Sequence, residues 1–533
     1  MDDNNPRVEA VYTKDGRIEA VGSYNSLKAL DPSAEEINLS GNTLMPGFIE
    51  PHLHVDLCAI IAQMHIISGL IYPDSKDVIA QLQKAVSETP KGEWILCFGL
   101  DYLLNRDFPE IDRYWLDELT KDHPIALIIQ SMHTMYINSL GLARAGIDRN
   151  TQDTRDGHCL KDESGEPIGI LTEQGFLMKV ILLWLKELHK SPNVMLEEIL
   201  TDWSKKGITT IWTAGYYPLF PGYFDILADT FNNPSCPIRG DYSISFNGIE
   251  SGLVNVSEIT DKDTDKTRLT GIKSWYDGSP YTGNTLMYHD YLENDIMQNK
   301  LYVPPHQNGE NLFSRERFLE ILRTYHGMGY QLSVHSQGDR AGHEVLDMFS
   351  TILKESPRKD HRHRLEHCAF IDKADLKTCG ELGLTLSFHT NHLYYYGEAL
   401  KELVVGEEVT EKMLPCRSAL DQGIKISFHS DAPMYDVAPL RVAANAVTRT
   451  TKRGTVIGAD EAITLTEALR GITIDAAWQL LREKDLGSIE VGKFADFTLL
   501  SKDPYEVDPL EVGDIPIITT YLSGVDTKTM HFD

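Results

Sequence analysis

The stretch IKISFHSDAP, residues 424–433, alternates apolar and polar side chains and contains a histidine and an aspartate near its end. Its even positions from 424 to 428 are apolar and would share one face of a β-strand, while its odd positions from 425 to 431 are polar. LSVHS (332–336) and LSFHT (386–390) repeat this pattern. In a parallel barrel, alternate residues face the surrounding helices or the interior, and active sites lie at the carboxyl ends of the strands. The repeated pattern therefore predicts a barrel with polar residues gathered at one end.

Short strand-like runs alternate with helical stretches, such as SRERFLEILRTYHGMG (314–329), through the middle of the chain. The expected strands are GFIEPHLH (47–54), GITTIWT (207–213), PIRGDYSI (237–244), TGIKSWYD (270–277), YQLSVH (330–335), HRLEH (363–367), LTLSFH (384–389) and IKISFHSD (424–431). Eight such runs separated by helices indicate an α/β fold, a (β/α)8 barrel of the TIM type over residues 46–485.

Two parts of the chain exceed what the barrel needs. Residues of about 75–195 follow the first strand and are expected to form an insertion subdomain over the barrel mouth, because barrels vary through these loops. An alternative counts IALIIQSMH (125–133) as a barrel strand. Alternating runs at both ends of the chain, each too short to bury a face alone, predict one small β-sandwich domain from residues 1–45 and 486–533.

The composition is that of a soluble globular protein, with 42% hydrophobic and 24% charged residues among 533. A net charge of −29 argues against nucleic-acid and anionic-membrane partners, and leaves a small-molecule substrate and a homo-oligomer open. The seven cysteines form no C-x-x-C pair, which is typical of reduced thiols. The start MDDNNPRVEA shows no secretory signal, and VILLWL (180–185) is too short to span a membrane. We therefore expect a cytoplasmic location.

The residues at the predicted strand ends suit a metal site. His52 and His54 in PGFIEPHLHVD project to one side of a strand and can hold one ion. A lone H-x-H pair is more often a surface or core pair, but this one follows an apolar strand with a Pro-Gly entry turn. The other candidates at strand ends are Lys273, His335, His367 and Asp431. Imidazoles and a carboxylate around an open position make a hydrolytic zinc-type site, where bound water has a pKa of about 7.

Seven motifs together resemble a known family. They are MPGFIEPHLH (45–54), MHTMYINS (132–139), GIKSWYDGS (271–279), SVHSQGDRA (333–341), HRLEHCAF (363–370), FHSDAPM (428–434) and GSIEVGKFADF (487–497). In this order they resemble the amidohydrolase superfamily, in the type-3 branch that includes N-substituted formamide deformylases. They extend over nearly the whole chain.

The resemblance implies a role for each candidate ligand. His52, His54 and Asp431 would hold one metal ion, His335 and His367 the other, and a CO₂-derived carbamate on Lys273 would bridge them. Asp431 would also move a proton from the attacking hydroxide to the leaving nitrogen. Zinc is expected first, although one ion, or manganese, iron or nickel, is compatible with such ligands.

A carbamate on Lys273 forms only if the side chain is desolvated enough to lose its proton, because only a neutral amine adds CO₂. Lys273 therefore has an alternative role. Without a carbamate it would pair with a carboxylate or with substrate around a single ion.

Further residues are candidates for the substrate pocket. His389 has the strand parity of a pocket residue, and His429 is expected one layer beneath Asp431, although either would also serve as an ordinary core histidine. His363 shares the parity of His367 but lies away from the carboxyl end. The remaining candidates are His133, which by the resemblance reaches the substrate and otherwise is structural, Trp275 beside Lys273, and Tyr395 in an aromatic segment after the seventh strand.

These expectations favour a metal-dependent hydrolase that cuts a C–N bond in a linear amide, an N-acyl or an N-formyl group. Hydrolysis of a cyclic amide, lactone or carbamate, or deamination of a ring, would use the same site, because one fold supports many reactions. A non-catalytic, metal-binding regulatory barrel is less favoured because the ligand set is complete.

Overall fold

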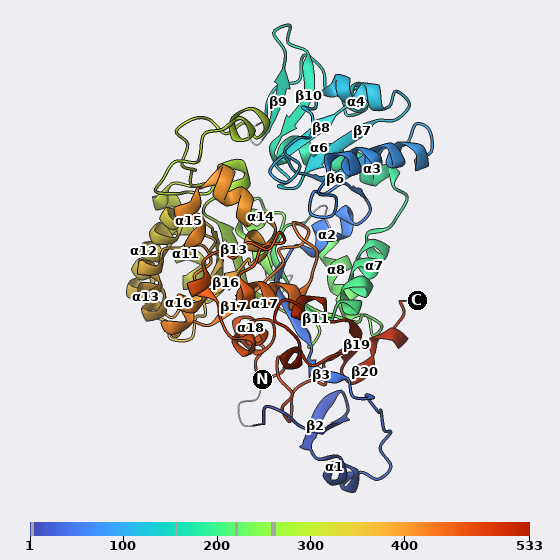
Figure 1. The fold of residues 1–533 in the computed structure, drawn as a ribbon, viewed down its shortest axis with the longest axis vertical. Helices are drawn as coiled ribbons and strands as arrows, with labels where there is room; N and C mark the ends of the chain where they lie inside the picture. The colour runs from blue at the N-terminus through green and yellow to red at the C-terminus, as the bar shows by residue number, and fades with distance from the viewer. Residues whose placement is uncertain (2–4, 155–156, 219–221, 257–262, 533) are drawn as a thin grey trace.

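The computed structural model describes residues 1, 5–154, 157–218, 222–256 and 263–532. Its central sheet has eight parallel strands in the order β17-β16-β15-β14-β13-β12-β11-β4 (Figure 1). Their bounds are β4 (Phe48–Leu53), β11 (Ile208–Tyr216), β12 (Arg239–Ser245), β13 (Leu269–Trp275), β14 (Gln331–Ser336), β15 (Arg364–His367), β16 (Thr385–Phe388) and β17 (Ile426–Phe428). The two outermost strands, β4 and β17, approach each other at their carboxyl ends. There the N–H of Asp431, just after β17, donates to the carbonyl oxygen of His52 in β4 at 3.2 Å. The sheet is thus a nearly closed barrel.

Each of the eight predicted barrel strands is present, with no bound displaced by more than three residues. The apolar positions that alternate along β14, β16 and β17 are buried in the main hydrophobic core, as the period-two pattern predicts. The predicted fold class is therefore confirmed.

Helices surround the barrel on the outside (Figure 1). Their bounds are α7 (Pro192–Lys205), α8 (Tyr223–Asn232), α11 (Arg315–Gly327), α12 (Asp339–Glu355), α13 (Lys373–Leu382), α17 (Pro439–Thr448), α18 (Leu465–Gly471) and α19 (Ile474–Gln479). Capping side chains define where several of these helices begin. Ser314 accepts a hydrogen bond from the N–H of Arg317 at the start of α11, and Thr464 and Glu467 form a capping box at the start of α18.

The insertion forms a separate mixed sheet above the barrel in Figure 1, in the order β5-β6-β7-β8-β10-β9. Its strands are β5 (His65–Ile66), β6 (Ile95–Leu100), β7 (Ile125–Ile129), β8 (Thr134–Ile137), β9 (His158–Lys161) and β10 (Pro167–Thr172), with α3 (Ser75–Glu88), α4 (Arg113–Leu119), α5 (Ser139–Arg144) and α6 (Glu173–Glu187). Because β7 pairs with β6 and β8, the alternative that made it a barrel strand is wrong.

Both ends of the chain contribute to antiparallel sheets at the bottom of Figure 1. β3 (Thr43–Pro46) pairs with β18 (Phe497–Leu500), which continues to β19 (Ile517–Leu522) and β20 (Val525–Asp526). The hairpin of β1 (Ala10–Lys14) and β2 (Arg17–Gly22) turns at Asp15 and Gly16, whose φ angles of 51° and 77° suit a two-residue hairpin turn. One hydrophobic cluster joins the hairpin to this sheet and includes Ile18, Phe497 and Tyr521. The exact domain limits stay a prediction.

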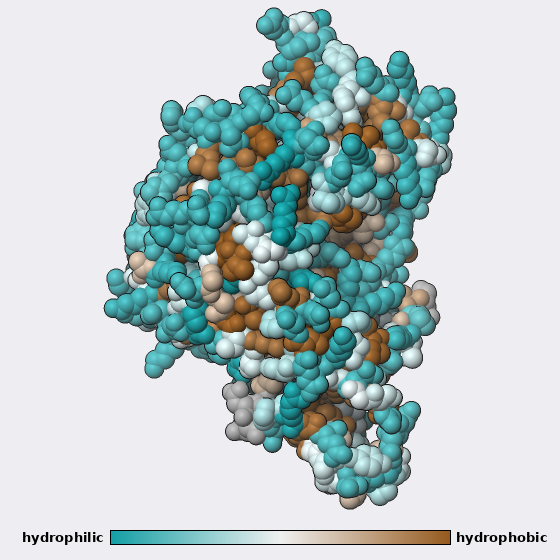
Figure 2. All heavy atoms as spheres, viewed as in Figure 1, coloured by the Kyte–Doolittle hydropathy of each residue, from teal (hydrophilic) through white to brown (hydrophobic). Residues whose placement is uncertain are grey.

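The surface is mostly hydrophilic on the face that Figure 2 shows, with separate apolar patches. Among the described helices, none combines the length and the apolar character that crossing a bilayer requires. All seven cysteines are buried and unpaired.

Candidate metal centre

Three predicted ligands meet where the barrel closes. His52 is the fifth residue of β4, His54 follows that strand, and Asp431 follows β17. Oδ1 of Asp431 lies 3.4 Å from Nε2 of His52 and 3.4 Å from Nε2 of His54. This oxygen is buried and accepts no hydrogen bond from any described residue. A buried carboxylate oxygen facing two imidazole nitrogens without a donor suits a cation.

Lys273 enters the same site from β13. Its Nζ lies 3.4 Å from Nε2 of His52, and the side chain is fully buried. Burial lowers the pKa of the amine to about 8. No carboxylate oxygen in the described part of the chain lies within 4.0 Å of Nζ. The structure thus gives no support to the alternative in which Lys273 pairs with a carboxylate of the protein.

His335 and His367 lie at the ends of the neighbouring strands β14 and β15, with ring centres 4.4 Å apart. The ring of His367 is also 4.7 Å from that of His52. Nε2 of His335 lies 3.3 Å from the carbonyl oxygen of Gly278, which can only accept a hydrogen bond. Nε2 therefore carries the hydrogen of the neutral ring, and Nδ1 keeps its lone pair. All six predicted ligands therefore lie in one cluster.

His367 reaches the site through an unusual backbone conformation. In the β14–β15 register His335 is opposite Glu366, and Ser336 is opposite His367. Regular alternation would thus direct His367 toward the helices with Leu365. Instead, His367 and Cys368 have φ angles of 72° and 51°, in the left-handed region that non-glycine residues rarely adopt. The strand alternation ends at His367, and such strain is typical of functional sites.

Burial keeps the imidazoles uncharged. Desolvation holds the pKa of His52 and His367 well below the usual value, and it lowers the pKa of His335 to about 3. A neutral imidazole has one free lone pair, the form that binds a metal ion. With the carboxylate of Asp431, the donor set fits a divalent cation.

Comparison with known proteins decides the family. The model of the amidohydrolase family matches residues 35–526. The chain belongs to the amidohydrolase family. It is 26% identical over 533 residues to an N-substituted formamide deformylase from Arthrobacter pascens, covering 98% of this chain and 96% of that protein. It is 27% identical to Protein LONG AFTER FAR-RED 3 of Arabidopsis thaliana, covering 98% and 89%.

Among solved structures, an uncharacterized metal-dependent hydrolase from Pyrococcus horikoshii has a TM-score of 0.71 at 20% identity, covering 94% of this chain and 95% of that one. This likeness supports the fold alone. Family membership confirms the resemblance that the motifs indicated, and it supports hydrolysis as the reaction type of this amidohydrolase.

The amidohydrolase has a buried group of polar side chains beneath the predicted ligands that the sequence analysis did not identify. Nδ1 of His52 donates to Oε2 of Glu366 at 2.7 Å, which directs Nε2 toward Asp431 and Lys273. Glu366 also accepts from the hydroxyl of Ser333 at 2.6 Å and pairs with Arg364 at 2.7 Å. The sequence contained one sign of this buried group. Arg364 and Glu366 are two charged residues that share one face of a short buried strand.

His429 lies in the same layer. Its Nε2 is 3.1 Å from Nδ1 of His367, and its Nδ1 is 2.8 Å from the hydroxyl of Ser387. Its ring is stacked on that of His52, with centres 4.6 Å apart. This fully buried histidine thus contacts two predicted ligands, as expected of a residue beneath the site.

The predicted substrate contacts occupy different places in this amidohydrolase. His389 is buried, with its ring centre 5.8 Å from that of His367, and the ring of Trp275 lies 4.7 Å from Nζ of Lys273. Tyr395 stacks on Tyr435, outside the ligand cluster, at 5.4 Å. His133 lies in the insertion, where its Nδ1 pairs with Glu173 at 2.9 Å. His389 and Trp275 thus lie beside the predicted ligands, while the described contacts of His133 do not reach them.

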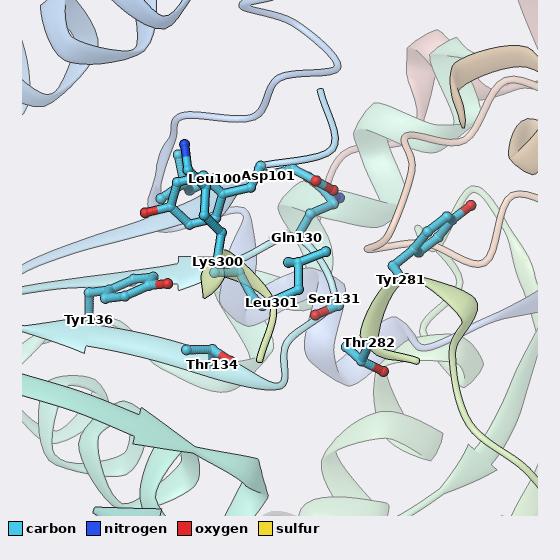
Figure 3. A pocket seen from close by; sticks show the side chains of 12 residues that line it. Leu100, Asp101, Gln130, Ser131, Thr134, Tyr136, Tyr281, Thr282, Lys300 and Leu301 are labelled. Atoms are coloured by element: carbon cyan, nitrogen blue, oxygen red, sulfur yellow. The ribbon is translucent and has the colours of Figure 1, made fainter. Parts of the chain in front are cut away.

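A pocket lies between the insertion and the barrel. Figure 3 shows Tyr281 and Thr282, from the loop after β13, on one side and Asp101 and Gln130 of the insertion on the other. Its described lining includes no predicted metal ligand. Tyr281 links this pocket to the histidines beside the predicted ligands. Its hydroxyl forms a hydrogen bond with Nδ1 of His392, whose ring centre is 4.1 Å from that of His389.

Proposed function

We propose that this amidohydrolase cleaves the C–N bond of a linear amide, an N-acyl or an N-formyl group in a small-molecule substrate. The observation that carries the proposal is the buried Oδ1 of Asp431, which lies 3.4 Å from Nε2 of both His52 and His54 and lacks a described hydrogen-bond donor. A similar protein over nearly the full chain is an N-substituted formamide deformylase, which favours the C–N bond.

In the proposed centre, His52, His54 and Asp431 would hold one divalent ion, and His335 and His367 would hold a second, with zinc as the first choice. Such ions supply Lewis acidity, which polarises a carbonyl group and lowers the pKa of water to about 7. The chain itself positions the ligands through buried contacts, such as that of His52 with Glu366 at 2.7 Å.

Asp431 has a second role as the group that moves a proton. Water adds to the carbonyl carbon, and the Asp431 carboxylate accepts the proton that the water releases. It then delivers this proton to the nitrogen as the C–N bond breaks, which yields a carboxylic acid and an amine. The support for this role is the position of the carboxylate among the predicted ligands, with Oδ1 at 3.4 Å from Nε2 of both His52 and His54.

Lys273 is proposed to carry a carbamate that bridges the two ions. The neutral amine adds CO₂ and loses one proton, which gives the anion. Its support is the burial that lowers the pKa of this amine to about 8 and the absence of a described carboxylate within 4.0 Å of Nζ. Both raise the share of this amine that is neutral and can react with CO₂ at physiological pH, compared with an exposed lysine.

A test uses the full chain loaded with zinc and a panel of N-formyl amines, N-acetyl amines, cyclic amides and ring amines. We expect turnover of a linear amide, which His52→Ala or Asp431→Asn abolishes without unfolding the barrel. Asp436→Asn is the matched control, because its exposed carboxylate pairs with Lys206 at 2.6 Å. Wild-type turnover in either site variant would reject the proposed site.

The same assay separates the alternatives. Turnover of only cyclic amides or ring amines would assign the same residues to the other bond classes. Full zinc occupancy without turnover of any substrate would favour a regulatory barrel. Lys273→Ala is expected to recover part of its activity with added short carboxylates, and its failure to do so with unchanged metal content would contradict the carbamate.

A further inference from the structure

Two buried histidines beside the proposed centre each have one ring nitrogen without a hydrogen-bond partner. His389 follows β16, and His392 lies in the first turn of α14 (Asn391–Ala399). Their ring centres are 4.1 Å apart, and their exposed fractions are 1% and 3%. Nδ1 of His389 and Nε2 of His392 form no hydrogen bond with any residue that the structure describes. Because buried polar atoms are nearly always paired, these two nitrogens indicate a place for a ligand.

The free nitrogen of His389 is a hydrogen-bond acceptor. Nε2 of this ring lies 3.0 Å from the carbonyl oxygen of Ser430, which can only accept, so Nε2 carries the hydrogen and Nδ1 keeps its lone pair. Ser430 is itself fixed, because its N–H and its hydroxyl donate to Glu50 at 3.1 and 2.9 Å. The orientation of the His389 ring is therefore set by the barrel.

The free nitrogen of His392 is a hydrogen-bond donor. The hydroxyl of Tyr281 bonds Nδ1 of His392 and lies 3.2 Å from the hydroxyl of Tyr435, which has no other hydrogen-bond partner among the described residues. Both phenolic hydrogens find an acceptor only when Tyr435 donates to Tyr281 and Tyr281 donates to Nδ1 of His392. The hydrogen of the neutral imidazole is then on Nε2, the unpartnered atom.

The pair thus offers one acceptor and one donor, and neither ring is charged. Burial holds the pKa of His389 well below its usual value and lowers the pKa of His392 to about 3. A carboxylate would meet the lone pair of His389, and an ammonium group would meet the N–H of His392. A hydroxyl or a carboxamide group suits both nitrogens, because each of these groups donates and accepts hydrogen bonds without carrying a charge.

The position of the pair connects it with the substrate. The ring centre of His389 is 5.8 Å from that of His367, and Tyr281, which bonds His392, lines the pocket between the insertion and the barrel (Figure 3). We propose that His389 and His392 together bind a hydroxyl or carboxamide group of the substrate, close to the bond that is cleaved. This inference rests on the proposed hydrolysis of a linear amide, and it narrows the substrates to amides with an uncharged polar substituent.

The test uses linear amides with one substituent on the second carbon of either the acyl or the amine part. The substituent is hydrogen, hydroxyl, carboxamide, carboxylate or ammonium. With the zinc-loaded, full-length chain, we expect kcat/KM to be about 10–100-fold higher for the hydroxyl or the carboxamide than for hydrogen, mainly through a lower KM. The carboxylate and the ammonium group should give no such gain, since each leaves one buried nitrogen facing a group of the wrong polarity.

Variants of the two histidines separate hydrogen bonding from packing. His389→Leu and His392→Leu should each lower the preference for the polar substituent to about one. His389→Asn keeps an acceptor and His392→Gln keeps a donor, so each should retain part of it. His343→Leu is the matched control, because His343 pairs with Asp375 at 3.0 Å on the surface. Thermal unfolding and zinc content check that each variant is folded and loaded.

The outcomes separate this inference from the proposed function. Equal kcat/KM for hydrogen and for both polar substituents in the wild type would overturn the inference, as would an unchanged preference in the folded leucine variants. Loss of zinc from these variants would assign the histidines to the metal centre and also overturn it. If no amide is turned over, the proposed function fails, and calorimetry gives the same comparison as dissociation constants. Tighter binding of a polar analogue to the wild type, but not to His392→Leu, would then support the inference, and equal or undetectable binding would overturn it.

Discussion

Nδ1 of His52 donates to Oε2 of Glu366 across the barrel interior, at 2.7 Å. This contact fixes which nitrogen of His52 faces Asp431, and Arg364 and Ser333 in turn hold the carboxylate of Glu366. A ligand held in this way loses little freedom when it binds an ion. The geometry of the proposed centre therefore depends on a residue that would not touch the metal.

Glu366→Gln is expected to lower zinc affinity by about 10–100-fold, because the amide weakens the acceptor for His52. The variant also leaves Arg364 without its buried counter-charge, which should cost about 3–5 kcal/mol of unfolding free energy. Competition with a chelator measures the affinity, and urea unfolding measures the stability. Ser333→Ala is the control, since it removes a 2.6 Å hydrogen bond to the same carboxylate but keeps the contact with His52. Equal affinity in Glu366→Gln and wild type would contradict the role of Glu366.

Gly215→Ala is expected to displace Lys273. Gly215 in β11 has a φ of +72°, and an added Cβ would lie 2.6 Å from the Trp275 ring and 2.9 Å from Cγ of Lys273. The variant should lose zinc affinity and about 1–3 kcal/mol of stability, because overpacking adds to backbone strain. Gly41→Ala controls for strain alone, because Gly41 has a φ of +79° and open space around it. Loss of stability equal to that of Gly41→Ala, with normal zinc binding, would exclude the steric effect.

The buried amine of Lys273 should make the stability of the metal-free chain depend on pH. Burial lowers its folded-state pKa from 10.5 to about 8, so between these values the unfolded chain binds the extra proton. The free energy of unfolding should therefore rise as pH increases above 8, by about 3 kcal/mol at most. Urea unfolding with chelator in CO₂-free buffer at pH 7.5 and 9.5 measures it. Lys273→Met should lack this contribution, and an identical rise in both proteins would refute it.

Sequence patterns were sufficient to predict the barrel, because the burial of alternate residues is a local property of each strand. They also predicted that the candidate ligands at the strand ends lie close together, as they do in the structure, since carboxyl ends of parallel strands meet at one rim. The role of Glu366 depends on which residue lies opposite across the barrel, and the orientation of His367 depends on a left-handed backbone angle of 72°. Neither property follows from the period of the sequence. The position of His133 likewise depended on how the insertion sheet folds, which the barrel pattern does not specify.

Tyr396→Phe tests the contact that joins the insertion to the barrel. The hydroxyl of Tyr396, on α14 (Asn391–Ala399), donates to Oδ2 of Asp101, while the N–H of Leu103 donates to Oδ1 at 2.7 Å. Burial raises the pKa of Asp101 to about 6, and the tyrosine hydrogen bond favours the ionised form. Its removal should raise this pKa further, because the buried anion loses a donor.

The loss of unfolding free energy in Tyr396→Phe should therefore grow as pH rises from 5 to 8, reaching about 1–3 kcal/mol where Asp101 is ionised in the wild type. At pH 5 the carboxyl is mostly protonated in the folded wild type, so the loss should be smaller. Urea unfolding at both pH values measures the difference, and hydrogen exchange in β6 shows whether the insertion is loosened. Tyr394→Phe, half-buried on the same helix, is the control. A loss of the same size at both pH values would show that the hydroxyl does not act through the ionised Asp101.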